Sequence, residues 1–122
     1  MGIESFNVDT ITEAPFSCAV LRRGQTSEIL LEGELDLAAK PALDSAVDDA
    51  LHSGPIETLM VDLTGVTFAD STTMTWLVHS NARTIAARAR LVVVAGPGPV
   101  LDVLRMTGID QCLTLVADGW MR

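Results

Sequence analysis

The residues best placed to do chemistry in this chain are four consecutive polar ones, Asp70-Ser71-Thr72-Thr73. Asp70 has the side chain of a helix N-cap, which accepts the free backbone N–H groups of a first helical turn. The three hydroxyl residues then lie in that turn, where the helix dipole is most positive. A phosphate added there would meet unpaired amides, so the segment is a candidate phosphorylation site. The same four residues also make an ordinary helix start, and the segment alone does not decide between the two interpretations.

The helix that follows is expected to run from Asp70 to about Arg88. A projection at about 100° per residue gives it one buried stripe. The residues of that stripe are Met74, Leu77, Val78, Asn81 and Ile85. Trp76 falls near the opposite side, one turn from the hydroxyl cluster. An outward tryptophan in such a place has the composition of a binding hot spot, so Trp76 is a candidate partner anchor. The alternative is that a neighbouring loop or the N-terminal tail covers it.

The elements that must position these residues follow from hydrophobic periodicity and turn signals. Strands are expected at residues 18–21, 28–32, 59–63, 91–95 and 113–116, and helices at 41–51, 70–88 and 100–106. A turn with two carboxylates, Gly33-Glu34-Leu35-Asp36, separates the second strand from the first helix. The order ββαβαβαβ indicates a layered α/β domain. Since no repeat or linker interrupts it, residues 1–122 are interpreted as one domain.

Charge and composition restrict the partners. The net charge is −8, and between Glu28 and Asp62 the chain has nine acidic residues and one basic residue, Lys40. Such a field repels phosphate backbones and anionic lipid, so neither nucleic acid nor a membrane is an expected partner. A partner with a basic surface is favoured, although an acidic surface can also serve solubility alone. No apolar run approaches the roughly 20 residues of a membrane span, and the N-terminus lacks signal-peptide features, so a cytoplasmic location is expected.

The sequence offers no constellation for catalysis, metal binding or a cofactor. Cys18 and Cys112 are far apart and form no CxxC motif, and His52 and His79 are isolated from each other and from any nucleophile. No GxSxG motif surrounds Ser71, so a hydrolase triad has no support. We therefore expect a protein that is not an enzyme and needs no cofactor.

Several segments together resemble the anti-sigma factor antagonist family and the wider STAS domain. They are Gly33-Glu34-Leu35-Asp36, the helix that begins Pro41-Ala42-Leu43, residues 59–63, Val66-Thr67-Phe68-Ala69-Asp70-Ser71, and Leu104-Arg105-Met106-Thr107-Gly108-Ile109. The similarity covers about residues 18–117, in order and with natural spacing. It implies a single STAS-type α/β domain, with a mixed β-sheet of four to five strands flanked by three to four helices.

The resemblance also implies a function. In that family an anti-sigma factor that is itself a serine kinase phosphorylates the residue after the Asp of the "DS" motif. This residue corresponds to Ser71, with Thr72 a less favoured acceptor. The unphosphorylated antagonist binds the anti-sigma factor and frees the sigma factor, phosphorylation ends that binding, and a phosphatase restores it. The Asp of the GELD segment, here Asp36, lies near the phosphosite in family members. The expected partner-binding residues are Asp36, Asp70, Ser71, Thr72, Thr73, Thr75 and Trp76, in a monomer or weak dimer.

The sequence departs from the family pattern directly after the phosphosite. Thr73 and Thr75 stand where family members have glycines. Glycines let a partner's backbone come close, whereas threonine side chains add bulk to the same surface. This departure leaves an alternative open: a STAS scaffold that does not cycle through phosphorylation, such as a stress-complex subunit or a transporter-type regulatory module.

Overall fold

The computed structural model describes residues 16–117, which form a five-stranded mixed sheet and helices. The strands are β1 (Phe16–Arg23), β2 (Thr26–Leu35), β3 (Thr58–Ala69), β4 (Arg90–Ala95) and β5 (Thr114–Ala117). The α-helices are α1 (Lys40–His52), α2 (Ser71–Ala86) and α3 (Pro99–Met106), with short 3-10 helices η1 (Leu37–Ala39) and η2 (Ile109–Cys112). The predicted element order and the mixed sheet are confirmed.

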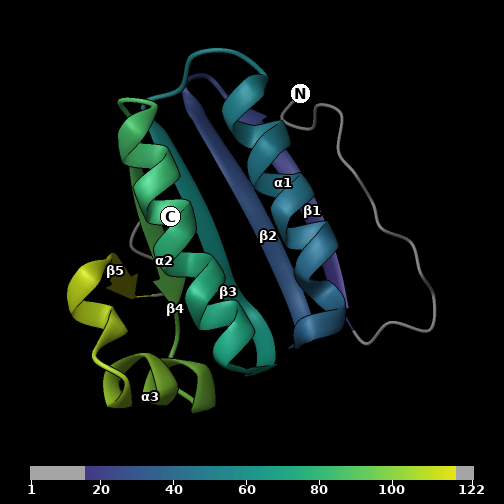
Figure 1. Cartoon of the computed structure of the whole chain (residues 1–122), viewed down its shortest axis with the longest axis vertical. Coiled ribbons are helices and arrows are strands. Elements are labelled where there is room, and N and C mark those ends of the chain that lie inside the picture. The colour runs from purple at the N-terminus through teal and green to yellow at the C-terminus, as the bar shows by residue number, and fades with distance from the viewer. Residues whose placement is uncertain (1–15, 118–122) are drawn as a thin grey trace.

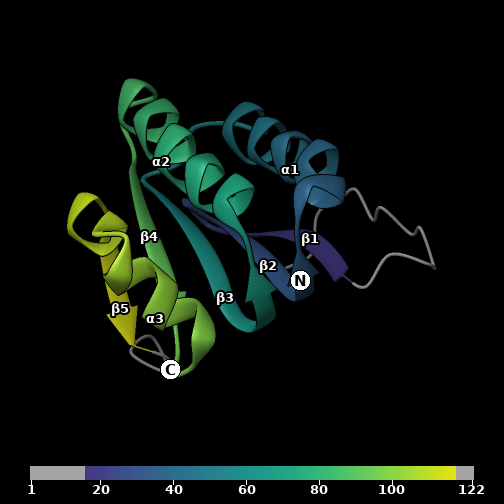
Figure 2. The same cartoon turned by 60° about the horizontal axis from the view of Figure 1, so that its bottom comes forward.

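The strands lie in the sheet in the order of the sequence, β1-β2-β3-β4-β5. β1 pairs with β2 antiparallel, and every later pair is parallel. The helices α1 and α2 run side by side over one face of the sheet and begin at the same end of it (Figure 1). Figure 2 shows the two helices above the strands. Since β2 and β3 both end where α1 and α2 begin, polar residues at these junctions are brought to one edge.

The main core lies between the helices and the sheet. Along β3 and β4, alternate residues enter it, as Val61 and Val93 do, and α3 contributes Val100 and Leu104 to the same core. The residues in between point to the opposite face, where Met60, Val92 and Val94 form a smaller buried cluster. Both strands are therefore buried on two faces, as their continuous apolar runs predicted. Within residues 16–117, no helix is long and apolar enough to cross a membrane.

β2 and β3 are longer than the sequence predicted, and their extensions position the site. The segment Gly33-Glu34-Leu35 is the end of β2 rather than part of a turn, and β3 continues to Ala69. The two extensions pair with each other through two register shifts, between Leu30 and Glu32 and between Gly33 and Glu34 of β2. Such bulges interrupt the alternation of apolar and polar residues from which strands are predicted, so the extensions were missed.

The first register shift depends on Asp62 and Gly65. The Asp62 carboxylate Oδ1 accepts the Thr64 backbone N–H at 2.9 Å and the Thr64 hydroxyl at 2.7 Å. At Gly65, an added Cβ would lie 2.8 Å from Cγ of Glu32 and 3.3 Å from the Leu31 carbonyl oxygen. The bulge therefore has room for glycine alone.

We expect Gly65→Ala to lower the free energy of unfolding by about 1–3 kcal/mol, because the new methyl group overpacks the bulge. Urea denaturation measures the change. Glu32→Ala removes the closest atom, Cγ, so the double variant Gly65→Ala/Glu32→Ala should recover part of the loss relative to Glu32→Ala alone. Equal losses in both backgrounds would show that the Glu32 side chain is not the obstacle.

Candidate functional site

Asp36 and Asp70 meet at the edge of the sheet where β2 and β3 end. Leu35 and Ala69 are paired residues in the register of these strands, and each aspartate is the next residue along its strand. The Asp70 N–H donates to the Leu35 carbonyl at 3.2 Å, which joins the two strand ends. The structure thus brings together two site residues that lie far apart in the sequence.

Each aspartate caps the helix that follows it. The Asp36 carboxylate Oδ1 accepts the Ala38 N–H at 2.9 Å at the start of η1. The Asp70 carboxylate Oδ1 accepts the N–H groups of Thr72 at 2.9 Å and Thr73 at 3.3 Å. Asp70 is therefore the N-cap that the sequence predicted. The prediction that a phosphate would meet unpaired amides is wrong for Thr72 and Thr73, because Asp70 already accepts both.

We expect Asp70→Ala to destabilise the protein by about 0.5–2 kcal/mol, since both amides lose their acceptor. Asp70→Asn keeps a capping oxygen and should be nearly neutral. Thermal unfolding followed by circular dichroism compares the two variants. An equal loss for Asp70→Asn and Asp70→Ala would mean that the carboxylate charge, rather than the cap, matters at this position.

The three hydroxyl residues of the first turn have different surroundings. Ser71 is exposed and is the first residue of α2, and Thr72 is partly buried. Thr73 is fully buried, and its hydroxyl donates to the Leu35 carbonyl at 3.3 Å. Thr75, one turn after Ser71, is exposed. The expectation that Thr73 adds bulk to the partner surface is therefore wrong, whereas Ser71, Thr72 and Thr75 are accessible to a partner.

Trp76 is buried, and the prediction that it faces outward is wrong. It is 3% exposed and belongs to the main core. The buried residues of α2 are Thr73, Met74, Trp76, Leu77, Ser80 and Thr84. Half of these are small and polar, so a helical projection that looks only for apolar residues assigned the buried face incorrectly. The Thr84 hydroxyl donates to the Ser80 carbonyl of the same helix at 2.7 Å, whereas the Thr73 hydroxyl donates to Leu35 of β2. The N-terminal tail, offered as one alternative cover for Trp76, lies outside the described residues.

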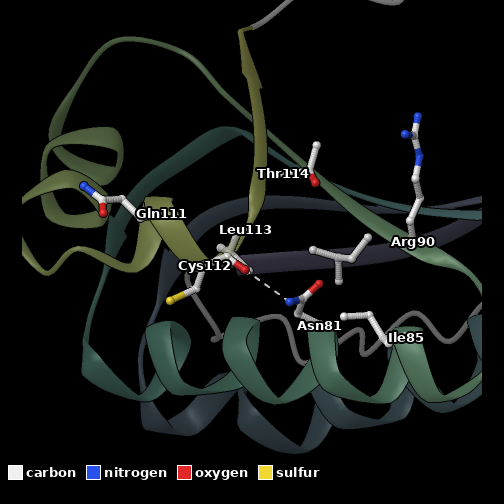
Figure 3. A pocket seen from close by; sticks show the side chains of 8 residues that line it. Asn81, Ile85, Arg90, Gln111, Cys112, Leu113 and Thr114 are labelled. Atoms are coloured by element: carbon white, nitrogen blue, oxygen red, sulfur yellow. Dashed lines mark hydrogen bonds between the residues drawn. The ribbon is translucent and has the colours of Figure 1, made fainter.

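Part of the predicted buried stripe instead faces an open groove beside η2 and β5 (Figure 3). The groove has a volume of about 320 Å³ and is lined by Asn81, Ile85, Arg90 and Leu113, among others. Ile85 is 61% exposed, and the Asn81 amide donates to the Cys112 carbonyl at 3.2 Å. Met74 and Leu77 are buried as predicted. The helix is thus rotated relative to the projection, with Trp76 turned inward and Ile85 outward.

Two exposed apolar residues flank the paired aspartates, and the sequence reasoning did not select them. Leu37 follows Asp36 and is 67% exposed, and Phe68 lies two residues before Asp70 and is 50% exposed. Exposed large apolar residues beside polar ones are typical of protein interfaces. The available signal was their position near the two aspartates, in segments between the strands and helices that the sequence predicted.

Charge at this edge is mostly negative. Glu34, Asp36 and Asp70 lie on the paired ends of β2 and β3 or directly after them. The one nearby lysine, Lys40, is bound to Asp44 by an ion pair of 2.6 Å. Among residues 16–117, no group of three or more His, Cys, Asp or Glu side chains could hold a metal ion. The edge therefore presents a hydroxyl, apolar side chains and carboxylates, a combination for binding a basic protein surface.

A single mixed sheet with its helices on one face and a serine after the capping aspartate of α2 together define a STAS-type domain. The sequence profile of the family described as "Mlab, STAS domain" matches residues 18–117. The chain belongs to this STAS-domain family. A search of curated protein sequences finds no match.

Solved structures include similar chains. An anti-sigma factor antagonist from Mycobacterium paratuberculosis is 25% identical, with a TM-score of 0.74, and the match covers 84% of this chain and 87% of that one. The unphosphorylated antagonist SpoIIAA is 18% identical, with a TM-score of 0.66 and coverage of 93% and 90%. The phosphorylated form of SpoIIAA, a Bacillus cell fate determinant, is also 18% identical, with a TM-score of 0.59 and coverage of 93% of each chain. The two SpoIIAA structures establish the similarity of fold.

Proposed function

We propose that this protein is an anti-sigma factor antagonist that binds an anti-sigma factor until Ser71 is phosphorylated. One observation carries the proposal: the exposed Ser71 starts α2 at the edge where Asp36 and Asp70 meet, in a STAS chain similar to a known antagonist. The anti-sigma factor is a serine kinase that modifies Ser71, and a phosphatase reverses the modification. The protein itself catalyses nothing, acts as a monomer or weak dimer, and works in the cytoplasm, where sigma factors are.

In the unmodified state, the partner packs over Ser71. Leu37, next to Asp36 in the chain, and Phe68, two residues before Asp70, are exposed and supply apolar contact area, and the aspartates face basic residues of the partner. Thr72 and Thr75 are within about one turn of Ser71 in α2 and are accessible as well, because neither is buried. Trp76 and Thr73 contribute indirectly, since they hold α2 against the core and are out of the partner's reach.

In the phosphorylated state, binding is lost through charge and bulk. The phosphate adds about −1.5 to −2 charges at neutral pH to a site that already carries the Asp70 carboxylate. Because Asp70 already accepts the Thr72 and Thr73 amides, the phosphate gains little compensation from the helix start. A partner seated on Ser71 would have to desolvate a dianion without a matching set of donors, which is costly.

A second candidate is a STAS scaffold that binds its partner without a phosphorylation cycle. The occupied amides of the first turn favour it, because the helix start is not prepared to receive a phosphate. The two functions share the fold and the interaction edge, and they differ in whether Ser71 is modified in the cell.

Mass spectrometry of the protein recovered from its own cells, under several growth conditions, tests the proposal. We expect a phosphorylated peptide with the phosphate on Ser71, in a proportion that changes with conditions, and an anti-sigma factor enriched with the unmodified form. Phosphate on Thr72 would move the switch by one residue. A chain that carries no phosphate under any condition and still binds its partner would support the scaffold.

A further inference from the structure

The end of the sheet opposite Ser71 is rich in arginine. Five of the eight basic residues lie there, although the net charge of the chain is −8. They are Arg22 and Arg23 at the end of β1, Arg83 in the last turn of α2, Arg88 after that helix, and Arg90 at the start of β4. This is the end at which α1 and α2 finish (Figure 1). The molecule therefore carries carboxylates at one end and guanidinium groups at the other.

Two of the five arginines are bound within the chain, and three are free. Arg22 donates to two carbonyls of the segment between α1 and β3, at 3.2 and 2.7 Å. Arg83 forms an ion pair of 2.6 Å with a carboxylate of α1. Among residues 16–117, no hydrogen bond or ion pair is formed by the guanidinium groups of the other three, which are exposed: Arg23, Arg88 and Arg90. Their charges are therefore accessible to another molecule.

The free arginines are placed by the sheet and by one unusual backbone conformation. One row of paired residues crosses four strands, in the order Arg23, Thr26, Thr58 and Arg90. Side chains in one row of a sheet lie on the same face, so the row has an arginine at each of its ends. Arg88 has a φ of 64° and is the one non-glycine residue within 16–117 with a positive φ. A side chain kept in a conformation that favours glycine points to a use for that side chain.

This arginine-rich end complements the interaction edge around Ser71. The interaction edge presents carboxylates beside exposed apolar side chains, and consists of Glu34, Asp36, Leu37, Phe68 and Asp70. The other surface, which we call the basic end, presents guanidinium groups beside an apolar side chain, and consists of Arg23, Ile85, Arg88 and Arg90. Ile85 is 61% exposed, and its carbonyl accepts the Arg88 N–H at 2.9 Å. The two surfaces have opposite charge, and both have apolar area to bury.

We propose that the basic end of one copy of this chain docks on the interaction edge of a second copy, so that unmodified molecules associate head to tail. Such a contact leaves one edge and one basic end unoccupied, so further copies can add. The association is weak, because exposed ion pairs contribute little each and the net charge of −8 opposes the approach of two copies. A docked copy covers Ser71 and competes with any other partner of that edge. The contact itself does not depend on the proposed function.

Sedimentation velocity of the unmodified full chain tests the contact, over concentrations from about 1 μM to about 1 mM. The basic-end variant is Arg23→Gln/Arg88→Gln/Arg90→Gln, which removes three exposed charges. The edge variant is Glu34→Gln/Leu37→Lys, which changes exposed residues and keeps both capping aspartates. Each variant lacks one of the two surfaces and retains the other.

Arg105→Gln is the control for the loss of an arginine, because Arg105 is exposed in α3 and belongs to neither surface. We expect the sedimentation coefficients of the wild type and of this control to rise with concentration at about 20 mM salt and to stay constant at about 500 mM, where charges are screened. Each of the two variants alone should associate at least about tenfold more weakly. An equimolar mixture of them contains one intact basic end and one intact edge, so it should form a heterodimer and nothing larger.

A wild type that stays monomeric at about 1 mM and low salt overturns the inference, and so does a basic-end variant that associates like the wild type. A mixture that stays monomeric contradicts it as well, as does a loss of association in Arg105→Gln as large as that in the basic-end variant. Circular dichroism checks that each variant folds. If the basic-end variant does not fold, Arg88→Gly takes its place, because glycine suits a positive φ after a helix. None of these samples contains a kinase or an anti-sigma factor, so the proposed function stands or fails separately.

Discussion

The protein with phosphoserine at position 71 should bind its anti-sigma partner at least about a hundredfold more weakly than the unmodified protein, a difference of about 2.7 kcal/mol. In the proposed complex the partner covers Ser71 next to Asp70, whose carboxylate already accepts the Thr72 and Thr73 amides of the first turn. A buried dianion without matched donors costs at least this much. Isothermal titration calorimetry with the anti-sigma factor identified from the source cells gives both dissociation constants.

Two substitutions separate the charge at Ser71 from the loss of its hydroxyl. Ser71→Ala should bind within a few-fold of the wild type, whereas Ser71→Asp should bind more weakly than Ser71→Ala. Gln25→Asp is the matched control for added charge, because Gln25 is exposed in the turn between β1 and β2, at the opposite end of the sheet. The control should leave affinity unchanged. A phosphorylated protein that binds as tightly as the unmodified one contradicts the switch.

Trp76→Ala should lower the free energy of unfolding by about 3–5 kcal/mol, the range for removing a large aromatic side chain from a core. Trp76 is 3% exposed and packs in the main core rather than at the surface. Urea denaturation measures the loss. Val78→Ala, on the exposed part of the same helix, is the control and should cost much less. An equally small effect of Trp76→Ala would mean that the indole is not part of the packed core.

Trp76→Phe tests a second property of the same side chain. The indole Nε1 is buried and has no hydrogen-bond acceptor among the described residues. An unsatisfied buried donor costs about 1–3 kcal/mol, so phenylalanine recovers that penalty while it loses some contact area. We therefore expect Trp76→Phe to lie within about 1 kcal/mol of the wild type, far from Trp76→Ala. A loss as large as that of Trp76→Ala would show that the indole has an acceptor after all.

Local chemistry could be predicted from the sequence, and long-range pairing could not. The Asp70 cap was predictable because a cap depends on one side chain and the two or three amides next to it. The strand extensions were missed because Gly33 and Gly65 interrupt the pattern, and only pairing between β2 and β3 makes those residues extended. The proximity of Asp36 to Asp70 has the same origin. It followed from a family resemblance and could not be worked out from the residues.

The buried face of α2 was mispredicted for a different reason. Hydrophobic periodicity assumes that core positions are apolar, yet Thr73, Ser80 and Thr84 occupy such positions. A threonine that donates to a nearby carbonyl loses little by burial, so it can replace an apolar residue without leaving a signal in the sequence. The partner-anchoring role assigned to Trp76 depended on that projection, and Leu37 and Phe68 take its place in the proposed interface.

The sequential order of the strands in the sheet also affects how the protein folds during synthesis. Each strand pairs with the strand that precedes or follows it in the sequence. Every pair of strands is therefore joined by a single connecting segment. Domains with such local topology fold faster than those that join distant segments. A ribosome delivers the chain from its N-terminus, and the residues of the interaction edge, from Asp36 to Thr75, emerge before β4 and β5. β4 and β5 are synthesised last and complete the sheet on the side away from β1. The nascent chain therefore contains every residue of the proposed interaction edge before synthesis ends.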